Sequence, residues 1–192
     1  MKRTSLLAIS CVAASAVTAI AAPIATTSYG GHDYELWESS GISWSDANLA
    51  AVGAGGYLAT LTDAAETAAV YGAFIGTGYF QPIEAQASQA WLGGYTTDPG
   101  FSTTDSTHWA WVTGEAWNAF AAGNFGGGEP NGDSSGLALN RYGTPEWNDE
   151  GGLVGGYIVE KGAVGVPDGG STLAFLGGAT LLLGALGRRV RG

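Results

Sequence analysis

Residues 129–149 read EPNGDSSGLALNRYGTPEWND, and two short runs within this stretch decide how the rest of the chain is interpreted. Glu129-Pro130-Asn131 and Trp147-Asn148-Asp149 each place a carboxylate close to a side-chain amide. Four oxygen donors of this kind suit a hard cation such as Ca²⁺, which takes about 6–8 oxygen ligands and would keep positions open for water or sugar hydroxyls. Each run alone is more typical of an ordinary turn, because Pro, Asn and Asp favour turns. The surrounding sequence therefore decides whether the two runs form one site.

The composition is that of one loop-rich domain. Of the 192 residues, 45% are apolar, only 12% are charged and 33 are glycine, which favours a β-containing domain over a helical bundle. The net charge is −10, and between the two ends of the chain only Arg141 and Lys161 are basic, against sixteen acidic residues. Such a chain repels phosphate backbones, so we expect no nucleic-acid partner. Much of the acidity is explained by solubility alone.

Residues 1–21 have the features of a secretory signal peptide. Lys2 and Arg3 precede an apolar stretch over 6–20, and Ala19-Ile20-Ala21 supplies small residues where a signal peptidase cleaves. We therefore expect export, with cleavage after Ala21. The single cysteine, Cys11, lies inside this segment, so the mature chain has no disulfide although export would permit one.

The other end of the chain carries a second targeting pattern. A linker and the motif Val166-Pro167-Asp168-Gly169-Gly170 occupy residues 162–170, and an apolar stretch with an Arg-rich end occupies 171–192. Its uncharged part, 171–187, can just cross a bilayer at about 1.5 Å per residue, and the arginines favour the cytoplasmic side. This layout resembles the PEP-CTERM type of tail that bacterial exosortases recognise. The resemblance implies transient anchoring, processing by an exosortase-type enzyme, and release to the envelope, outer surface or extracellular matrix. A plain membrane anchor is the alternative.

Between these ends, local patterns predict two helices and several short strands. Ser43 to Asp46 can cap a helix that stops at the glycines of 53–56, and Asp63 to Glu66 forms a second capping box. Alternation and glycine punctuation predict strands over 34–37, 58–61, 90–93, 109–112, 136–140 and 156–160.

The order of motifs over 34–160 resembles the C-type lectin-like domains, and we assign 22–161 to one such domain. The matching features are Trp44 and Ala47 on the first helix, Gly55 to Thr60, Glu66, Trp91-Leu92-Gly93-Gly94, Trp109 to Gly114, Glu129-Pro130-Asn131, Trp147-Asn148-Asp149, and Tyr157 to Glu160. The resemblance implies an α+β fold with two helices, small antiparallel sheets closed by the terminal strands, and a long loop region that holds Ca²⁺.

The same resemblance implies a site. In this family Glu-Pro-Asn, with a cis peptide before the proline, accompanies binding of mannose-type sugars. Carried over, Glu129, Asn131, Asn148 and Asp149 would bind Ca²⁺ and the sugar hydroxyls. Carboxylates would accept hydrogen bonds from those hydroxyls, and amides would donate to them. Asp133 is the natural substitute for a further acidic metal ligand that the family places after Glu-Pro-Asn.

The chain departs from the family pattern in its cysteines. Ala51 and Val159 stand where one usual disulfide would be, and approximately Gly136 and Gly152 stand where the other would be. Each missing link removes about 2–4 kcal/mol of stability. We expect Trp44, Trp91, Trp109, Trp111 and Trp147 to compensate from the core, while Trp37 and Trp117 are equally compatible with core and surface. Phe125 replaces a common tryptophan.

No catalytic site is predicted. His32 and His108 stand alone, without a partner at metal-ligand or catalytic spacing. We therefore expect a non-enzymatic protein with two alternative functions. The first is Ca²⁺-dependent binding of carbohydrate, with mannose-type sugars favoured, in envelope or matrix adhesion. The second is a metal-independent structural or protein-interaction domain of the cell surface or matrix.

Overall fold

The computed structural model describes residues 22–82, 85–98 and 104–162. The expected signal peptide, the Val-Pro-Asp motif and the expected apolar anchor lie outside these residues. Within the described part of the chain, no helix is long and apolar enough to span a membrane.

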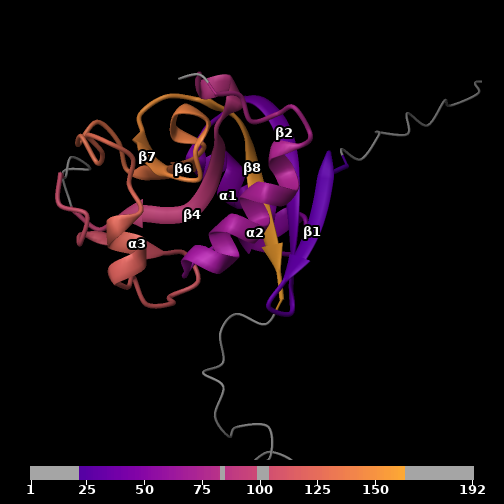
Figure 1. The fold of residues 1–192 in the computed structure, drawn as a ribbon, viewed down its shortest axis with the longest axis horizontal. Helices are drawn as coiled ribbons and strands as arrows, with labels where there is room; N and C mark the ends of the chain where they lie inside the picture. The colour runs from indigo at the N-terminus through magenta and orange to yellow at the C-terminus, as the bar shows by residue number, and fades with distance from the viewer. Residues whose placement is uncertain (1–21, 83–84, 99–103, 163–192) are drawn as a thin grey trace, which may run out of the picture.

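One sheet of eight strands organises the fold, in the order β1-β2-β8-β4-β6-β7, with β3 added beside β8 and β5 beside β4 (Figure 1). The pairings are antiparallel except that between β4 and β8, which is parallel. The strand bounds are β1 Ala25–Tyr29, β2 His32–Ile42, β3 Tyr57–Leu58, β4 Ala90–Thr96, β5 Trp109–Trp111, β6 Gly136–Leu139, β7 Trp147–Glu150 and β8 Val154–Lys161.

The terminal strands close the sheet, as expected. β2 pairs with β8 from Asp33↔Lys161 to Ile42↔Val154. The N-terminal hairpin of β1 with β2 was not predicted from the sequence, and Gly30 and Gly31 form its turn with φ of 61° and 91°. Such positive φ values are typical of two-residue hairpin turns. The expected strand over 58–61 is shorter than predicted, since β3 covers only Tyr57–Leu58.

Both predicted helices are confirmed, and their caps explain where they begin. α1 spans Trp44–Gly53, with the Ser43 side chain accepting from the Asp46 N–H. α2 spans Ala64–Ile75, with Asp63 accepting from the N–H groups of Ala65 and Glu66. These bonds satisfy amides that the first turn leaves without partners. The two helices cover opposite faces of the sheet, since α1 packs in the hydrophobic cluster that contains Val159 and α2 packs in the cluster that contains Ile158; α2 is the helix in front in Figure 1. Short helical segments not predicted from the sequence are α3 (Ala119–Gly123), η1 (Gln86–Ser88) and η2 (Arg141–Gly143).

Tryptophans form much of the core, as expected. Trp91, Trp109, Trp111 and Trp147 are at most 3% exposed. Trp44 is only partly buried, in contrast to the prediction, because its indole lies at the edge of the smaller core cluster and donates to the Leu92 carbonyl. Several ring contacts surround Trp147, which meets Trp111 edge-on at 5.5 Å and Phe120 at 5.8 Å between ring centroids.

Packing occupies the positions where the family's disulfides would lie. Ala51 and Val159 are both fully buried in one hydrophobic cluster. At Gly136, an added Cβ would lie 2.9 Å from the Trp44 ring, and at Gly152 it would overlap the Gln86 amide. The space of the second link is therefore taken by side chains from α1 and η1.

Candidate functional site

The strand β7 presents alternating side chains to two sides of the sheet. It pairs with β6 in a regular antiparallel register, with Ala138 opposite Asn148 and Leu137 opposite Asp149. Because side chains alternate along a strand, Asn148 and Glu150 share one side and Asp149 faces the other. The predicted Asn148–Asp149 pair is therefore divided by the strand.

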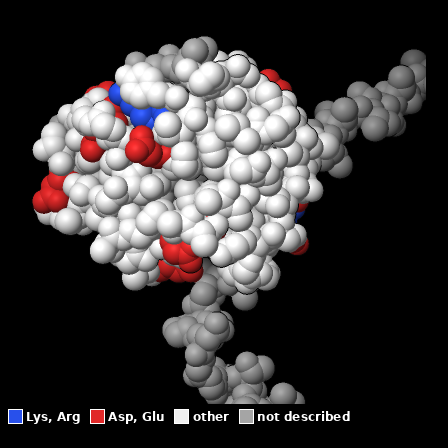
Figure 2. All heavy atoms as spheres, in the orientation of Figure 1, with Lys and Arg blue, Asp and Glu red and all other residues white. Residues whose placement is uncertain are grey.

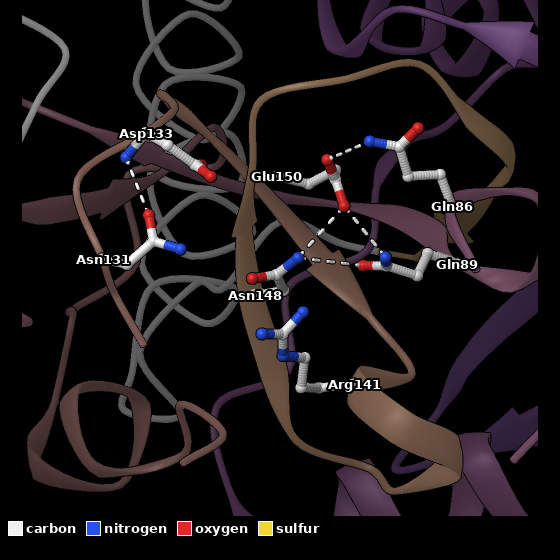
Figure 3. A pocket seen from close by; sticks show the side chains of 7 residues that line it. All are labelled: Gln86, Gln89, Asn131, Asp133, Arg141, Asn148 and Glu150. Atoms are coloured by element: carbon white, nitrogen blue, oxygen red, sulfur yellow. Dashed lines mark hydrogen bonds between the residues drawn. The ribbon is translucent and has the colours of Figure 1, made fainter. Parts of the chain in front are cut away.

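A polar cavity of about 380 Å³ lies on the Asn148 side of β7. Its lining side chains are all polar or charged: Gln86, Gln89, Asn131, Asp133, Arg141, Asn148 and Glu150 (Figure 3). Three of these, Asn131, Asp133 and Asn148, were predicted from the sequence. Glu129 and Asp149, also predicted, do not line the cavity and lie at its border through their contacts with Arg141 and Asn131.

Glu150 holds one wall of the cavity together. Its Oε1 accepts from Gln86 Nε2 at 2.8 Å and from the Gly152 N–H at 2.9 Å. Its Oε2 accepts from Gln89 Nε2 at 2.9 Å and from Asn148 Nδ2 at 3.1 Å. One nearly buried carboxylate thus fixes three amide side chains that face the cavity.

Asn148 is left with an unused acceptor. Its Nδ2 donates to Glu150, and its Oδ1 is buried without a hydrogen-bond partner among the described residues. Figure 3 shows this oxygen turned toward Asn131 and Asp133, away from the Glu150 wall. A buried acceptor without a partner costs free energy of about 1–3 kcal/mol, so a bound donor or cation at this oxygen would be stabilising.

Glu129 and Arg141 form a buried ion pair at the cavity border. Arg141 Nη2 lies 2.5 Å from Glu129 Oε1, and the Glu129 side chain is only 2% exposed. The Glu129-Pro130 peptide is cis, as the resemblance implied. Burial, and then the adjoining Asp149 carboxyl, raise the pKa of Glu129 to about 7, while the Arg141 guanidinium acts in the opposite direction.

The loop after Pro130 is held by Asp149. Asp149 Oδ1 accepts from the Asn131 N–H at 2.9 Å, and Oδ2 accepts from the Gly132 N–H at 2.8 Å. Asn131 Oδ1 in turn accepts from the Asp133 N–H at 3.0 Å. Burial, followed by the charge of Asp149, raises the pKa of the Asp133 carboxyl.

The expected Ca²⁺ ligands are therefore close together but already engaged. Glu129 is paired with a guanidinium, and both Asp149 oxygens accept backbone amides. Of the described residues, no three His, Cys, Asp or Glu side chains converge as a metal site. The arrangement as it stands does not fit a Ca²⁺ ion, since the metal would have to replace Arg141 at Glu129.

Four residues that line the cavity were not predicted, and the sequence indicated some of them more clearly than others. Glu150 follows Trp147-Asn148-Asp149 directly, and the period of a strand would have placed it beside Asn148. Arg141 stood out as one of two basic residues in the body. Figure 2 shows how sparse charge is on one face, with basic atoms in one main patch beside acidic ones. Gln86 and Gln89 had no local signal, because η1 reaches the cavity only through the tertiary fold.

Comparison with solved structures identifies the fold. Human lithostathine superposes with a TM-score of 0.54 at 19% identity, covering 72% of this chain and 97% of that one. The C-type carbohydrate-recognition domain of cow CD23, solved in the presence of a GlcNAc2Man3 oligosaccharide, gives 0.52 at 19% identity, with 73% and 95% covered. SPL-2, a Ca²⁺-independent C-type lectin from Saxidomus purpuratus, gives 0.51 at 19% identity, with 73% and 93% covered.

These similarities establish an α+β, C-type lectin-like fold, as the motif order predicted. At such low identity they speak to the fold alone. Comparisons with protein-family models and with curated protein sequences find no match.

Proposed function

We propose that this protein is an exported, non-enzymatic, carbohydrate-binding domain that takes its ligand in the polar cavity beside β7. The observation that carries the proposal is the buried Asn148 Oδ1, an acceptor that faces the cavity without a partner among the described residues. A sugar hydroxyl could donate to this oxygen. Fixed amides and carboxylates around it match the mixed donors and acceptors of a sugar ring.

The size and chemistry of the cavity support a small polar ligand. Its volume of about 380 Å³ falls in the usual range for ligand sites, about 300–1,000 Å³. The described lining includes no aromatic ring, so binding would rest on hydrogen bonds. Affinity for one monosaccharide should then be low, and several copies on one surface would raise it. Such a protein suits adhesion in the envelope or extracellular matrix, after transient anchoring and exosortase-type processing of its tail.

A second candidate mode uses Ca²⁺, as the sequence resemblance implies. In it Glu129, Asn131, Asp133, Asn148 and Asp149 would hold the metal, and Glu129, Asn131, Asn148 and Asp149 would also contact a mannose-type sugar. The donor chemistry and the unpartnered Asn148 oxygen favour this mode, and the Arg141–Glu129 pair opposes it.

Glycan-array binding by the purified protein tests the proposal. The variant Asn131→Asp keeps the oxygen that accepts from Asp133 but replaces the amide donor with a carboxylate. Loss of one hydrogen bond should weaken binding about tenfold. Asn48→Asp makes the same change on α1, away from the cavity, and should leave binding unchanged. A protein that binds no glycan, with or without Ca²⁺, would instead support a structural or protein-interaction role.

A further inference from the structure

Arg141 is built into the site rather than lying on the surface by chance. Its side chain is 12% exposed and enters from η2, directly after β6. The preceding Asn140 has a left-handed backbone conformation, with φ of 82°. Both ends of its side-chain amide are hydrogen-bonded: the Tyr71 hydroxyl donates to Oδ1 at 2.8 Å, and Nδ2 donates to the Ser88 carbonyl at 2.8 Å. A buried hydrogen-bond network therefore fixes the turn that carries the guanidinium.

Room for the Arg141 stem is provided on the facing loop. At Gly126 an added Cβ would lie 2.7 Å from Arg141 Cγ and 3.2 Å from its Cβ. Any larger residue would displace the stem. The turn and the glycine together direct Arg141 toward Glu129.

The position of Arg141 matters because its positive charge balances the acidic side chains around the cavity. The acidic side chains at or beside the cavity are Glu129, Asp133, Asp149 and Glu150. The only other basic residue between residues 22 and 162, Lys161, is paired with Glu35 at 2.7 Å on β2. Among the described basic residues, only Arg141 offsets these carboxylates.

We propose that the Arg141 guanidinium is a resident cation that stands in place of Ca²⁺, so that wild-type protein keeps its site formed and binds glycan without metal. That the site needs no metal is argued from Arg141 and the surrounding carboxylates, whereas metal-free glycan binding rests on the proposed function. Since a covalently attached cation cannot be chelated or diluted away, the site would not respond to the calcium level of its surroundings. Removing the guanidinium should expose Glu129 and create a requirement for a divalent cation.

Calcium titration of four full-length proteins tests this by calorimetry and thermal melting after treatment with EDTA. Wild type and Lys161→Gln, a matched loss of one positive charge on β8, should show no heat and no shift in melting temperature at about 1 mM Ca²⁺. Arg141→Gln should bind Ca²⁺ with a dissociation constant of about 10⁻⁴–10⁻³ M, the range of extracellular modules, and should melt higher with the metal. Arg141→Met, which keeps the aliphatic stem beside Gly126, should respond as Arg141→Gln does.

The outcomes separate this inference from the proposed function. Calcium binding by the wild type overturns the inference by itself, even where a variant fails to fold, and so does a folded Arg141 variant without a calcium response. An Arg141 variant that folds only with Ca²⁺ supports it. In the glycan arm, wild-type binding that survives EDTA supports the inference, and binding abolished by EDTA contradicts it. Absence of all glycan binding overturns the proposed function and leaves the metal readout intact.

Discussion

Glu150→Gln is the substitution that most directly tests how the cavity is assembled. The wild-type carboxylate only accepts hydrogen bonds, and four N–H donors point at it. Glutamine has the same shape but replaces one oxygen with an NH₂ group. Because the Gly152 N–H cannot rotate, the remaining oxygen should stay on its side, and the new NH₂ group should face Gln89 and Asn148.

The magnitude follows from these contacts. Hydrogen bonds to a charged group contribute about 1.5–3 kcal/mol each, so two bonds lost at Oε2 amount to about 3–6 kcal/mol. Rotation of the Gln89 amide can recover one neutral bond of about 1 kcal/mol. We therefore expect Glu150→Gln to lower the free energy of unfolding by about 2–5 kcal/mol.

Urea unfolding followed by tryptophan fluorescence measures this loss. Glu146→Gln is the matched control, since that exposed side chain makes the same chemical change and should alter stability by about 0.5 kcal/mol or less. Glu150→Gln should also weaken glycan binding, because Gln89 and Asn148 lose their shared anchor in the cavity wall. A stability change for Glu150→Gln no larger than that of the control would refute the reasoning that this carboxylate organises the cavity.

Three further predictions concern the core and the terminal sheet. Gly136→Ala should destabilise the domain by about 1–3 kcal/mol, because its Cβ would meet the Trp44 ring. Gly127→Ala is the control and should not destabilise it, since no atom lies within 4 Å of the added Cβ there. Equal melting temperatures for the two variants would contradict this prediction. Trp147→Ala should cost about 3–5 kcal/mol and reduce the near-ultraviolet circular dichroism, since its ring is fully buried among other aromatic rings; a loss below about 1 kcal/mol would argue against that packing. Burial raises the pKa of the Glu160 carboxyl, so the folded state holds this proton to a higher pH than the unfolded chain does. The contribution of Glu160 to stability is therefore greatest below its ordinary pKa, and it falls as the pH rises through the pKa of the folded state. Urea midpoints of wild type and Glu160→Gln, measured between about pH 4 and 8, give the stability of wild type relative to the variant. This difference should decline as the pH rises, and a constant or rising difference would contradict the raised pKa.

Local signals in the sequence predicted the elements that depend on neighbouring residues. Ser43 and Asp63 bond to amides two or three positions ahead, so the starts of α1 and α2 could be predicted from adjacent letters. The order of tryptophan and glycine motifs predicted the α+β, C-type lectin-like fold. By contrast β1 was not predicted, because it depends on pairing with β2 as much as on its own side chains.

The site was only half contained in the sequence, for a physical reason. The two short runs, together with the family resemblance, brought Asn131, Asp133 and Asn148 into one proposal, and the fold does place them around one cavity. Spacing could not show that Asp149 faces the other side of β7, or that Glu129 already has a cationic partner. Ion pairs and hydrogen-bond networks form between residues that only the chain's path brings together. The sequence by itself predicted the fold and the loop after Pro130 that borders the cavity. Only the tertiary structure decided which oxygens remain open, and that a guanidinium lies where the motif alone predicted a metal.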